Sequence, residues 1–148
     1  EGRPLAPLHA QRTVAAGLAE GPLLGGNLMV LSSLVGTGAL PSFSGAVLLL
    51  EDVGERPYRL DRLWTQCRQA GVFQGVRGLV LGDFTDCEER GAAYGSAEVL
   101  DELAWELGVP CAAGFPVGHG ELNQPVPLGA RVRLDAGARG LEFLEGLT

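Results

Sequence analysis

A chain of 148 residues, 46% of them hydrophobic, is long and apolar enough to form one compact domain with a buried core, which excludes extended disorder. A net charge of −7 argues against nucleic acid as a partner, because phosphate binding needs a basic stripe and the eleven cationic side chains are scattered. No membrane is expected either, since the apolar run at residues 46–50 is far shorter than the roughly 20 residues that cross a bilayer and no signal peptide opens the chain.

The first elements of the chain are short and separated by glycine and proline. Residues 3–17 predict two short strands or an edge ribbon. Residues 20–27, with the sequence EGPLLGGN, predict a turn-forming loop. Asn27 is then a plausible N-cap for a short buried helix over residues 28–35, which Gly36 closes.

The middle of the chain alternates strand and helix patterns. The apolar run at 46–50 is typical of a buried parallel strand, and it leads directly into Glu51 and Asp52. A helix is expected from about residue 61 to residue 70, then a second buried strand at 78–82, then a helix over 96–107 that begins at Ser96. The acidic pair would therefore lie at the carboxyl end of a parallel strand, where open α/β sheets build their sites.

The last part of the chain predicts a third short parallel strand at 111–115 and an antiparallel hairpin across 130–144. A small parallel sheet, an antiparallel layer and flanking helices should therefore coexist. The fold class is α/β.

One imidazole and one carboxylate side chain stand out as candidates for catalysis. His119 lies between Gly118 and Gly120 on a loop where the backbone can approach a ligand closely, whereas the other histidine, His9, is expected to be a solvated surface residue. Glu51 follows five apolar residues and should be half-buried, so that it needs a partner. If the two meet, the carboxylate can orient the imidazole and stabilise its protonated form, although a solvated acid and a structural histidine remain the alternatives.

The chain offers no obvious nucleophile for such a pair. Ser32 and Ser33 fall in the apolar helix, where hydroxyl groups usually bond back to the preceding turn. Cys87 and Cys111 lack neighbouring cations that would lower a thiol pKa, and the odd number of cysteines favours reduced thiols in a cytoplasmic protein. The residues predict no metal site and no phosphate-binding loop.

Three segments, in family order, resemble the L,D-carboxypeptidase (muramoyltetrapeptide carboxypeptidase) family of serine peptidases. They are GGNL at 25–28 with GT at 36–37, LEDVGERPYRLDR at 50–62, and GFPVGH at 114–119 with PLG at 127–129. The resemblance spans roughly residues 18–145. It implies a C-terminal domain of the swivelling β/β/α type at residues 18–148, preceded by a linker or edge strands at 1–17.

The resemblance also implies a role for each candidate. Glu51 matches the glutamate and His119 the histidine of a Ser-Glu-His triad. The serine and its oxyanion hole belong to an N-terminal flavodoxin-like domain, which this sequence lacks, so the chain alone should be inactive. Asn27, Tyr58 and Arg62 are candidate substrate contacts; Arg62 could hold a substrate carboxylate in a bidentate fork, or else pair with Asp52 or Asp61.

The implied reaction is removal of the terminal D-alanine from cytoplasmic murein tetrapeptide during wall recycling, without a cofactor, by an enzyme that is usually a homodimer. Two other interpretations stay open. The family includes microcin-immunity peptidases, which cleave an amide of a peptidyl or acyl nucleotide analogue. The isolated domain could instead be a non-catalytic dimerisation or ligand-binding module.

Overall fold

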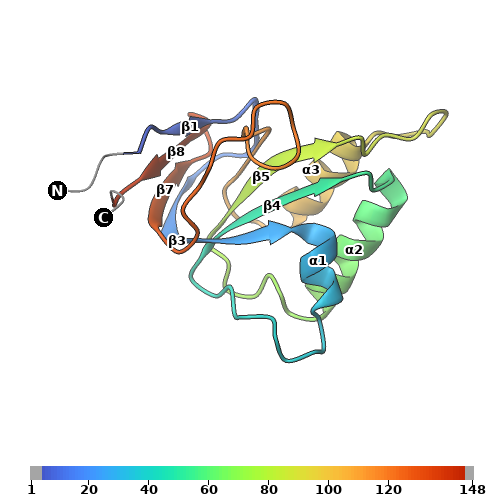
Figure 1. The fold of residues 1–148 in the computed structure, drawn as a ribbon, viewed down its shortest axis with the longest axis horizontal. Helices are drawn as coiled ribbons and strands as arrows, with labels where there is room; N and C mark the ends of the chain where they lie inside the picture. Colours follow the sequence, from blue (N-terminus) through green and yellow to red (C-terminus); the bar gives the residue numbers. More distant parts are fainter. Residues whose placement is uncertain (1–4, 146–148) are drawn as a thin grey trace.

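The computed structural model describes residues 5–145, and its eight strands form a curled sheet in the spatial order β1-β8-β7-β3-β4-β5-β6-β2 (Figure 1). The strands are β1 Leu8–His9, β2 Arg12–Ala15, β3 Leu18–Asn27, β4 Val47–Val53, β5 Gly78–Thr85, β6 Cys111–Ala113, β7 Arg131–Asp135 and β8 Gly140–Phe143. The helices are α1 Leu28–Ser33, α2 Pro57–Gln69 and α3 Ser96–Glu106. Among the described residues no helix combines the length and the apolar character needed to cross a membrane.

The long strand β3 joins a parallel and an antiparallel part of the sheet. Its first half pairs with β7 antiparallel, and its second half pairs with β4 parallel. Beyond it, β4, β5 and β6 are parallel neighbours, whereas β1, β8 and β7 are antiparallel. This arrangement confirms the α/β class with a parallel sheet, an antiparallel part and flanking helices.

The prediction of a loop at residues 20–27 is wrong, because these residues belong to β3. Here the glycines serve close packing of backbone on backbone. A Cβ at Gly25 would overlap the carbonyl group of Leu49, and one at Gly21 would overlap the carbonyl group of Gly45. A glycine-rich segment that looks like a turn is therefore a strand pressed against its neighbours.

The three helices form where the sequence predicts them, except that α2 begins earlier than expected. Asn27 caps α1 as expected, accepting a 3.0 Å hydrogen bond from the backbone N–H of Val30. The helix expected from residue 61 begins four residues earlier, at Pro57. Proline suits the first turn of a helix, because its missing N–H would have no helical partner there.

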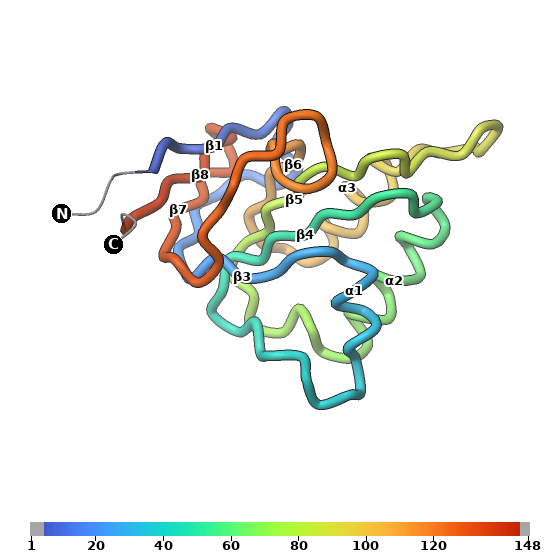
Figure 2. Tube along the Cα trace, viewed as in Figure 1, coloured from blue at the N-terminus to red at the C-terminus, as the bar shows by residue number. Residues whose placement is uncertain are grey.

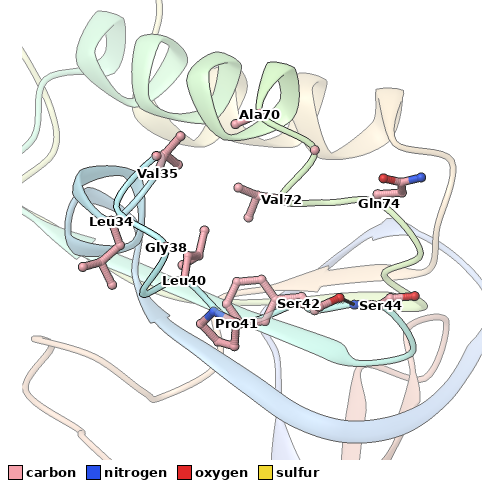
Figure 3. Close-up of a pocket in the computed structure, with 13 residues that line it drawn as sticks. Leu34, Val35, Gly38, Leu40, Pro41, Ser42, Ser44, Ala70, Val72 and Gln74 are labelled. Atoms are coloured by element: carbon pink, nitrogen blue, oxygen red, sulfur yellow. Dashed lines mark hydrogen bonds between the residues drawn. The ribbon is translucent and has the colours of Figure 1, made fainter.

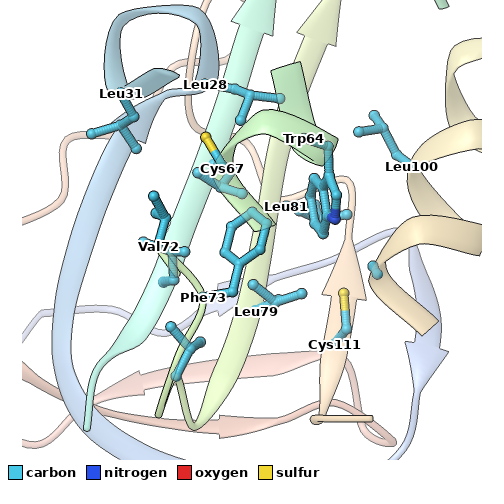
Figure 4. Close-up of a cluster of buried hydrophobic side chains, with 14 of the residues drawn as sticks. Leu28, Leu31, Trp64, Cys67, Val72, Phe73, Leu79, Leu81, Leu100 and Cys111 are labelled. Atoms are coloured by element: carbon cyan, nitrogen blue, oxygen red, sulfur yellow. The ribbon is translucent and has the colours of Figure 1, made fainter. Parts of the chain in front are cut away.

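Two hydrophobic cores lie on the two sides of the parallel strands, and alternate side chains of β4 contribute to each. Leu48 and Leu50 contribute to the core beneath the helices, together with Trp64 and Cys67 of α2 (Figure 4). Val47 and Leu49 face the opposite core, which lies inside the curl of the sheet. We call these the helix face and the inner face of β4.

The two N-terminal strands occupy the two ends of the spatial order although only two residues separate them. The backbone N–H of Ala10 donates to the carbonyl of Arg139 beyond β7, and that of Gln11 donates to the carbonyl of Ala113 in β6. The tube in Figure 2 shows this segment running past β8 toward β6. The N-terminal segment thereby brings the two ends of the sheet together.

Candidate active site

A glutamate and a histidine meet at the carboxyl ends of the parallel strands. The Nδ1 atom of His119 lies 2.7 Å from the Oε2 atom of Glu51, although 68 residues separate them in sequence. Glu51 is near the end of β4, and His119 is on the loop that follows β6. The structure thus brings together the two residues that the sequence predicts to form a pair.

Strand alternation explains the position of Glu51. It follows Val47 and Leu49 on the inner face, and its residue is only 7% exposed. A carboxylate buried to this degree without a partner would be costly, and His119 supplies that partner. The imidazole remains half-exposed, with 51% of its side chain accessible.

Glycines allow the histidine loop to approach the strands. A Cβ at Gly118 would lie 2.8 Å from Oε2 of Glu51, and the φ of 128° at Gly118 is one that other residues rarely adopt. A Cβ at Gly82 of β5 would overlap the carbonyl oxygen of Val117. The loop is also bonded to β5, because the backbone N–H of Asp83 donates to the carbonyl of Val117 at 2.8 Å.

The geometry of the pair fixes what it can do chemically. An ionised carboxylate only accepts hydrogen bonds, so with Glu51 ionised the Nδ1 atom of His119 carries the proton. The Nε2 atom then has a free lone pair, on a ring that is open to solvent. Such an imidazole can accept a proton from an approaching hydroxyl group.

Asp52, the next residue, faces the helices instead. It is 2% exposed, and its Oδ2 accepts a 2.9 Å hydrogen bond from the backbone N–H of Met29 at the start of α1. Its Oδ1 accepts from the amide of Asn27 at 3.0 Å. The Asn27 side chain is therefore engaged at both ends, with Asp52 and with the N–H of Val30.

The other two predicted substrate contacts, Tyr58 and Arg62, form a separate group on α2. The Arg62 guanidinium lies over the Tyr58 ring, 5.6 Å from its centroid, and both residues line a hollow of about 700 Å³. Within residues 5–145, Arg62 forms no ion pair, so the expected alternatives with Asp52 and Asp61 are not present. No hydrogen bond between described residues links this group to the Glu51–His119 pair.

The hydroxyl and thiol groups that the sequence raised as nucleophiles are used in packing. Ser32 is buried and donates to Oε1 of Gln66, and Ser33 bonds back to the carbonyl of Val30. Cys67, Cys87 and Cys111 are all buried, and burial raises the pKa of the Cys111 thiol to about 12. In the described part of the chain, the only side-chain hydrogen bond to His119 comes from Glu51.

A second hollow lies at the opposite, amino end of the parallel strands (Figure 3). It has a volume of about 470 Å³ and lies between the loop that leaves α1 and the turn that follows α2. None of its lining residues is titratable, and none is a predicted site residue. It therefore offers no acid–base chemistry.

The described residues contain no group of three or more His, Cys, Asp or Glu side chains that could hold a metal ion. His9 is exposed on β1 and takes no part in the pair. The sequence analysis missed one carboxylate near the site, that of Asp83. It is an acid that follows a buried apolar run within a strand, the same signal that singled out Glu51.

Comparisons with known proteins point to one family. The family described as "LD-carboxypeptidase C-terminal domain" matches residues 20–134. A putative carboxypeptidase of Synechocystis is 40% identical over 97% of this chain, which covers 48% of that protein. The murein tetrapeptide carboxypeptidase of Pseudomonas aeruginosa is 38% identical over 86% of this chain, which covers 40% of that protein.

Solved structures give the same picture. The crystal structure of muramoyltetrapeptide carboxypeptidase from Oxalobacter formigenes superposes with a TM-score of 0.86 at 29% identity, covering 99% of this chain and 52% of that one. The structure of the microcin self-immunity protein MccF in complex with glutamyl sulfamoyl guanosine gives a TM-score of 0.80 at 25% identity, covering 93% of this chain and 42% of that one. The chain thus spans about half, or less, of the length of the proteins it matches.

Proposed function

This chain belongs to the LD-carboxypeptidase family, and from that premise we propose that Glu51 and His119 are the carboxylate and the imidazole of a serine carboxypeptidase active site. The observation that carries the proposal is the 2.7 Å contact between His119 Nδ1 and Glu51 Oε2 at the carboxyl ends of the parallel strands. The domain at residues 18–148 contributes this pair, and β1 and β2 before it are edge strands of the same sheet.

In the proposed reaction, the Nε2 atom of His119 takes the proton of a serine hydroxyl as that oxygen attacks the peptide carbonyl. Glu51 keeps the proton on Nδ1, so that Nε2 is the basic atom, and stabilises the imidazolium that forms. The imidazolium then gives its proton to the leaving amine, and a second cycle with water releases the acyl group.

The serine would come from an N-terminal domain that is not part of this chain. Two observations support this. His119 has no hydroxyl partner among the described residues while its ring is half-exposed, and the chain spans about half the length of its relatives. We therefore expect the isolated chain to be inactive and its His119 face to meet the domain that carries the nucleophile.

For the substrate we propose a murein tetrapeptide, from which the enzyme removes the terminal D-alanine. The names of the Pseudomonas aeruginosa and Oxalobacter formigenes proteins support this class of substrate. Arg62 could hold the terminal carboxylate of the peptide, because its guanidinium has no carboxylate partner in the described part of the chain. Tyr58 would orient Arg62, and Asn27, at the start of α1, would be a further substrate contact. No cofactor enters the proposed reaction.

The same resemblance leads us to propose that the full-length enzyme is a cytoplasmic homodimer that takes part in peptidoglycan recycling. Microcin-immunity activity is the competing function, supported by the likeness to MccF. The murein peptide is favoured because the relatives named for it share more of their sequence with this chain, at 34% and 38% against 28% for MccF.

The test is release of D-alanine from murein tetrapeptide by the full-length protein. We expect His119→Ala to abolish release and His9→Ala, which removes an exposed histidine from β1, to leave it intact. A nucleotide conjugate offered in parallel separates the microcin function. Unchanged turnover by the His119 variant would overturn the proposal. Cleavage of the nucleotide conjugate but not of the murein peptide would mean that the conjugate is the substrate.

A further inference from the structure

The carboxylate of Asp83 reaches the active-site loop because β5 carries an extra residue opposite Glu51. In the pairing of β4 with β5, Leu50 is the partner of Leu81, but Asp52 is the partner of Phe84. Gly82 and Asp83 together therefore oppose the single residue Glu51. An irregularity of this kind is a β-bulge, and bulges re-aim side chains at the ends of strands.

Without the bulge, alternation would place Asp83 on the helix face with Leu81. Phe84 packs against the helix-side core, as the partner of Asp52 should, so the regular alternation resumes after the bulge. Asp83 instead lies against Gly120: a Cβ added to Gly120 would be 2.7 Å from the carboxylate carbon of Asp83. A side chain at position 120 would have to displace the Asp83 carboxylate.

Two carboxylates from neighbouring strands thus hold two consecutive residues of one loop. Glu51 of β4 bonds the imidazole of His119, and the carboxylate of Asp83 of β5 lies in contact with Gly120. The backbone N–H of Asp83 also donates to Val117, three residues before Gly120. The backbone before His119 is therefore bonded to β5 and the residue after it is in contact with β5, while the side chain of His119 is bonded to β4.

The charge on Asp83 is unfavourable for folding. Burial raises the pKa of Asp83 and the nearby Glu51 carboxylate raises it further, while the Gly120 N–H opposes both effects. A neutral side chain of the same shape would avoid the first two costs. A variant with that side chain can therefore separate stability from function.

We propose that Asp83 is a positioning residue of the active site, which holds the Gly118–Gly120 backbone so that Nε2 of His119 points at the reacting hydroxyl. Asp83 does not touch substrate; it acts through the contact of its carboxylate with Gly120. This inference rests on the proposed function for its effect on turnover, but the contact itself can be tested without turnover. Substitution of a residue that only supports the fold would lower the stability of the protein, whereas substitution of Asp83 should lower its activity first.

The experiment compares Asp83→Ala and Asp83→Asn in the full-length protein, with Glu121→Ala as the control. Glu121 is an exposed carboxylate on the same loop and has no described side-chain bond. For Asp83→Ala we expect kcat to fall at least about 10-fold at unchanged KM, because misplacement of a catalytic group by around 1 Å can cost as much as 10²-fold. Asp83→Asn keeps the shape of the side chain and its contact with Gly120, so it should restore most of the rate and also raise the unfolding temperature. Glu121→Ala should match the wild type.

Amide hydrogen exchange of Gly120 and the ring nitrogen shifts of His119, measured on this chain, separate the two proposals. If the full-length protein has no peptidase activity, the proposed function fails, yet faster exchange at Gly120 and shifted His119 resonances in Asp83→Ala would still support the positioning role. Unchanged exchange and shifts would overturn that role. So would full kcat in Asp83→Ala of an active enzyme, or a rate loss that Asp83→Asn does not relieve.

Discussion

Glu51 and Asp52 are neighbours on β4, yet they face two regions of the molecule with different tasks. On the inner face, Glu51 bonds one half-exposed imidazole on a loop built from glycines. On the helix face, Asp52 is bonded to the start of α1 through Asn27 and the N–H of Met29. The inner face leaves a reactive atom free, whereas the helix face satisfies its polar atoms internally. Two adjacent acids at the end of a strand can therefore be expected to divide chemistry and structure between them.

The largest effect should come from Glu51→Gln in the full-length protein. The carboxamide can donate to Nδ1 of His119, which would move the ring proton to Nε2 and remove the basic atom. We expect kcat to fall roughly 10⁴-fold, the size of loss seen when a serine-protease triad loses its carboxylate charge. Urea unfolding of the same variant should change little. A loss below tenfold would mean that Glu51 does not orient the histidine.

Asp52→Ala should give the opposite result. It leaves the Asn27 amide and the Met29 N–H without their acceptor at a buried position. We expect the free energy of unfolding to fall by about 1 to 3 kcal/mol, the cost of an unsatisfied buried polar group. Folded enzyme should keep most of its activity. Glu89→Ala, at an exposed position of the loop after β5, is the control that should not change stability. If Asp52→Ala instead lost activity without losing stability, the division between the two faces would be wrong.

Asn27→Ala tests the helix face at a smaller scale. Its side chain accepts the N–H of Val30 and donates to Asp52, so the variant loses the N-cap of α1. A loss of about 1 kcal/mol in unfolding free energy is expected for a cap of this kind. Measuring KM for the peptide in the same variant tests the proposed substrate role of Asn27. A rise in KM well beyond the change in stability would support a direct contact.

The smallest effect concerns pH and the third carboxylate. Since the pKa of folded Asp83 is raised above its ordinary value by burial and by Glu51, the folded protein holds this proton at pH values where the unfolded chain has released it. Stability should therefore fall as the pH rises from the ordinary aspartate value through the raised one. Asp83→Asn should remove that part of the slope. Unfolding midpoints measured across the acidic range will show it, and an unchanged slope would contradict the assignment.

Much of the site could be predicted because its signals are local. Glu51 follows an apolar run that has the length and composition of a buried strand, and His119 stands between two glycines on a loop after another strand. Strand alternation then separates Glu51 from Asp52. The pairing itself needed the family resemblance, since sequence spacing says nothing about a contact across 68 residues.

The features that the sequence did not predict have physical causes. β3 looks like a turn because Gly21 and Gly25 are there for close backbone contact, which depends on strands that come later in the chain. The predicted start of α2 is four residues late because the first turn of the helix is marked by Pro57 and not by an apolar repeat. Asp83 was missed because its direction depends on a bulge, which strand periodicity does not reveal.

The short N-terminal segment has one further consequence. β1 covers the outer side of β8 and β2 covers the outer side of β6, with only Ala10 and Gln11 between them. Loss of residues 8–15 would uncover the hydrogen-bonding groups of two strands at once. Unpaired strands of this kind are templates for pairing with other molecules, so the trimmed protein should aggregate rather than simply lose a terminus.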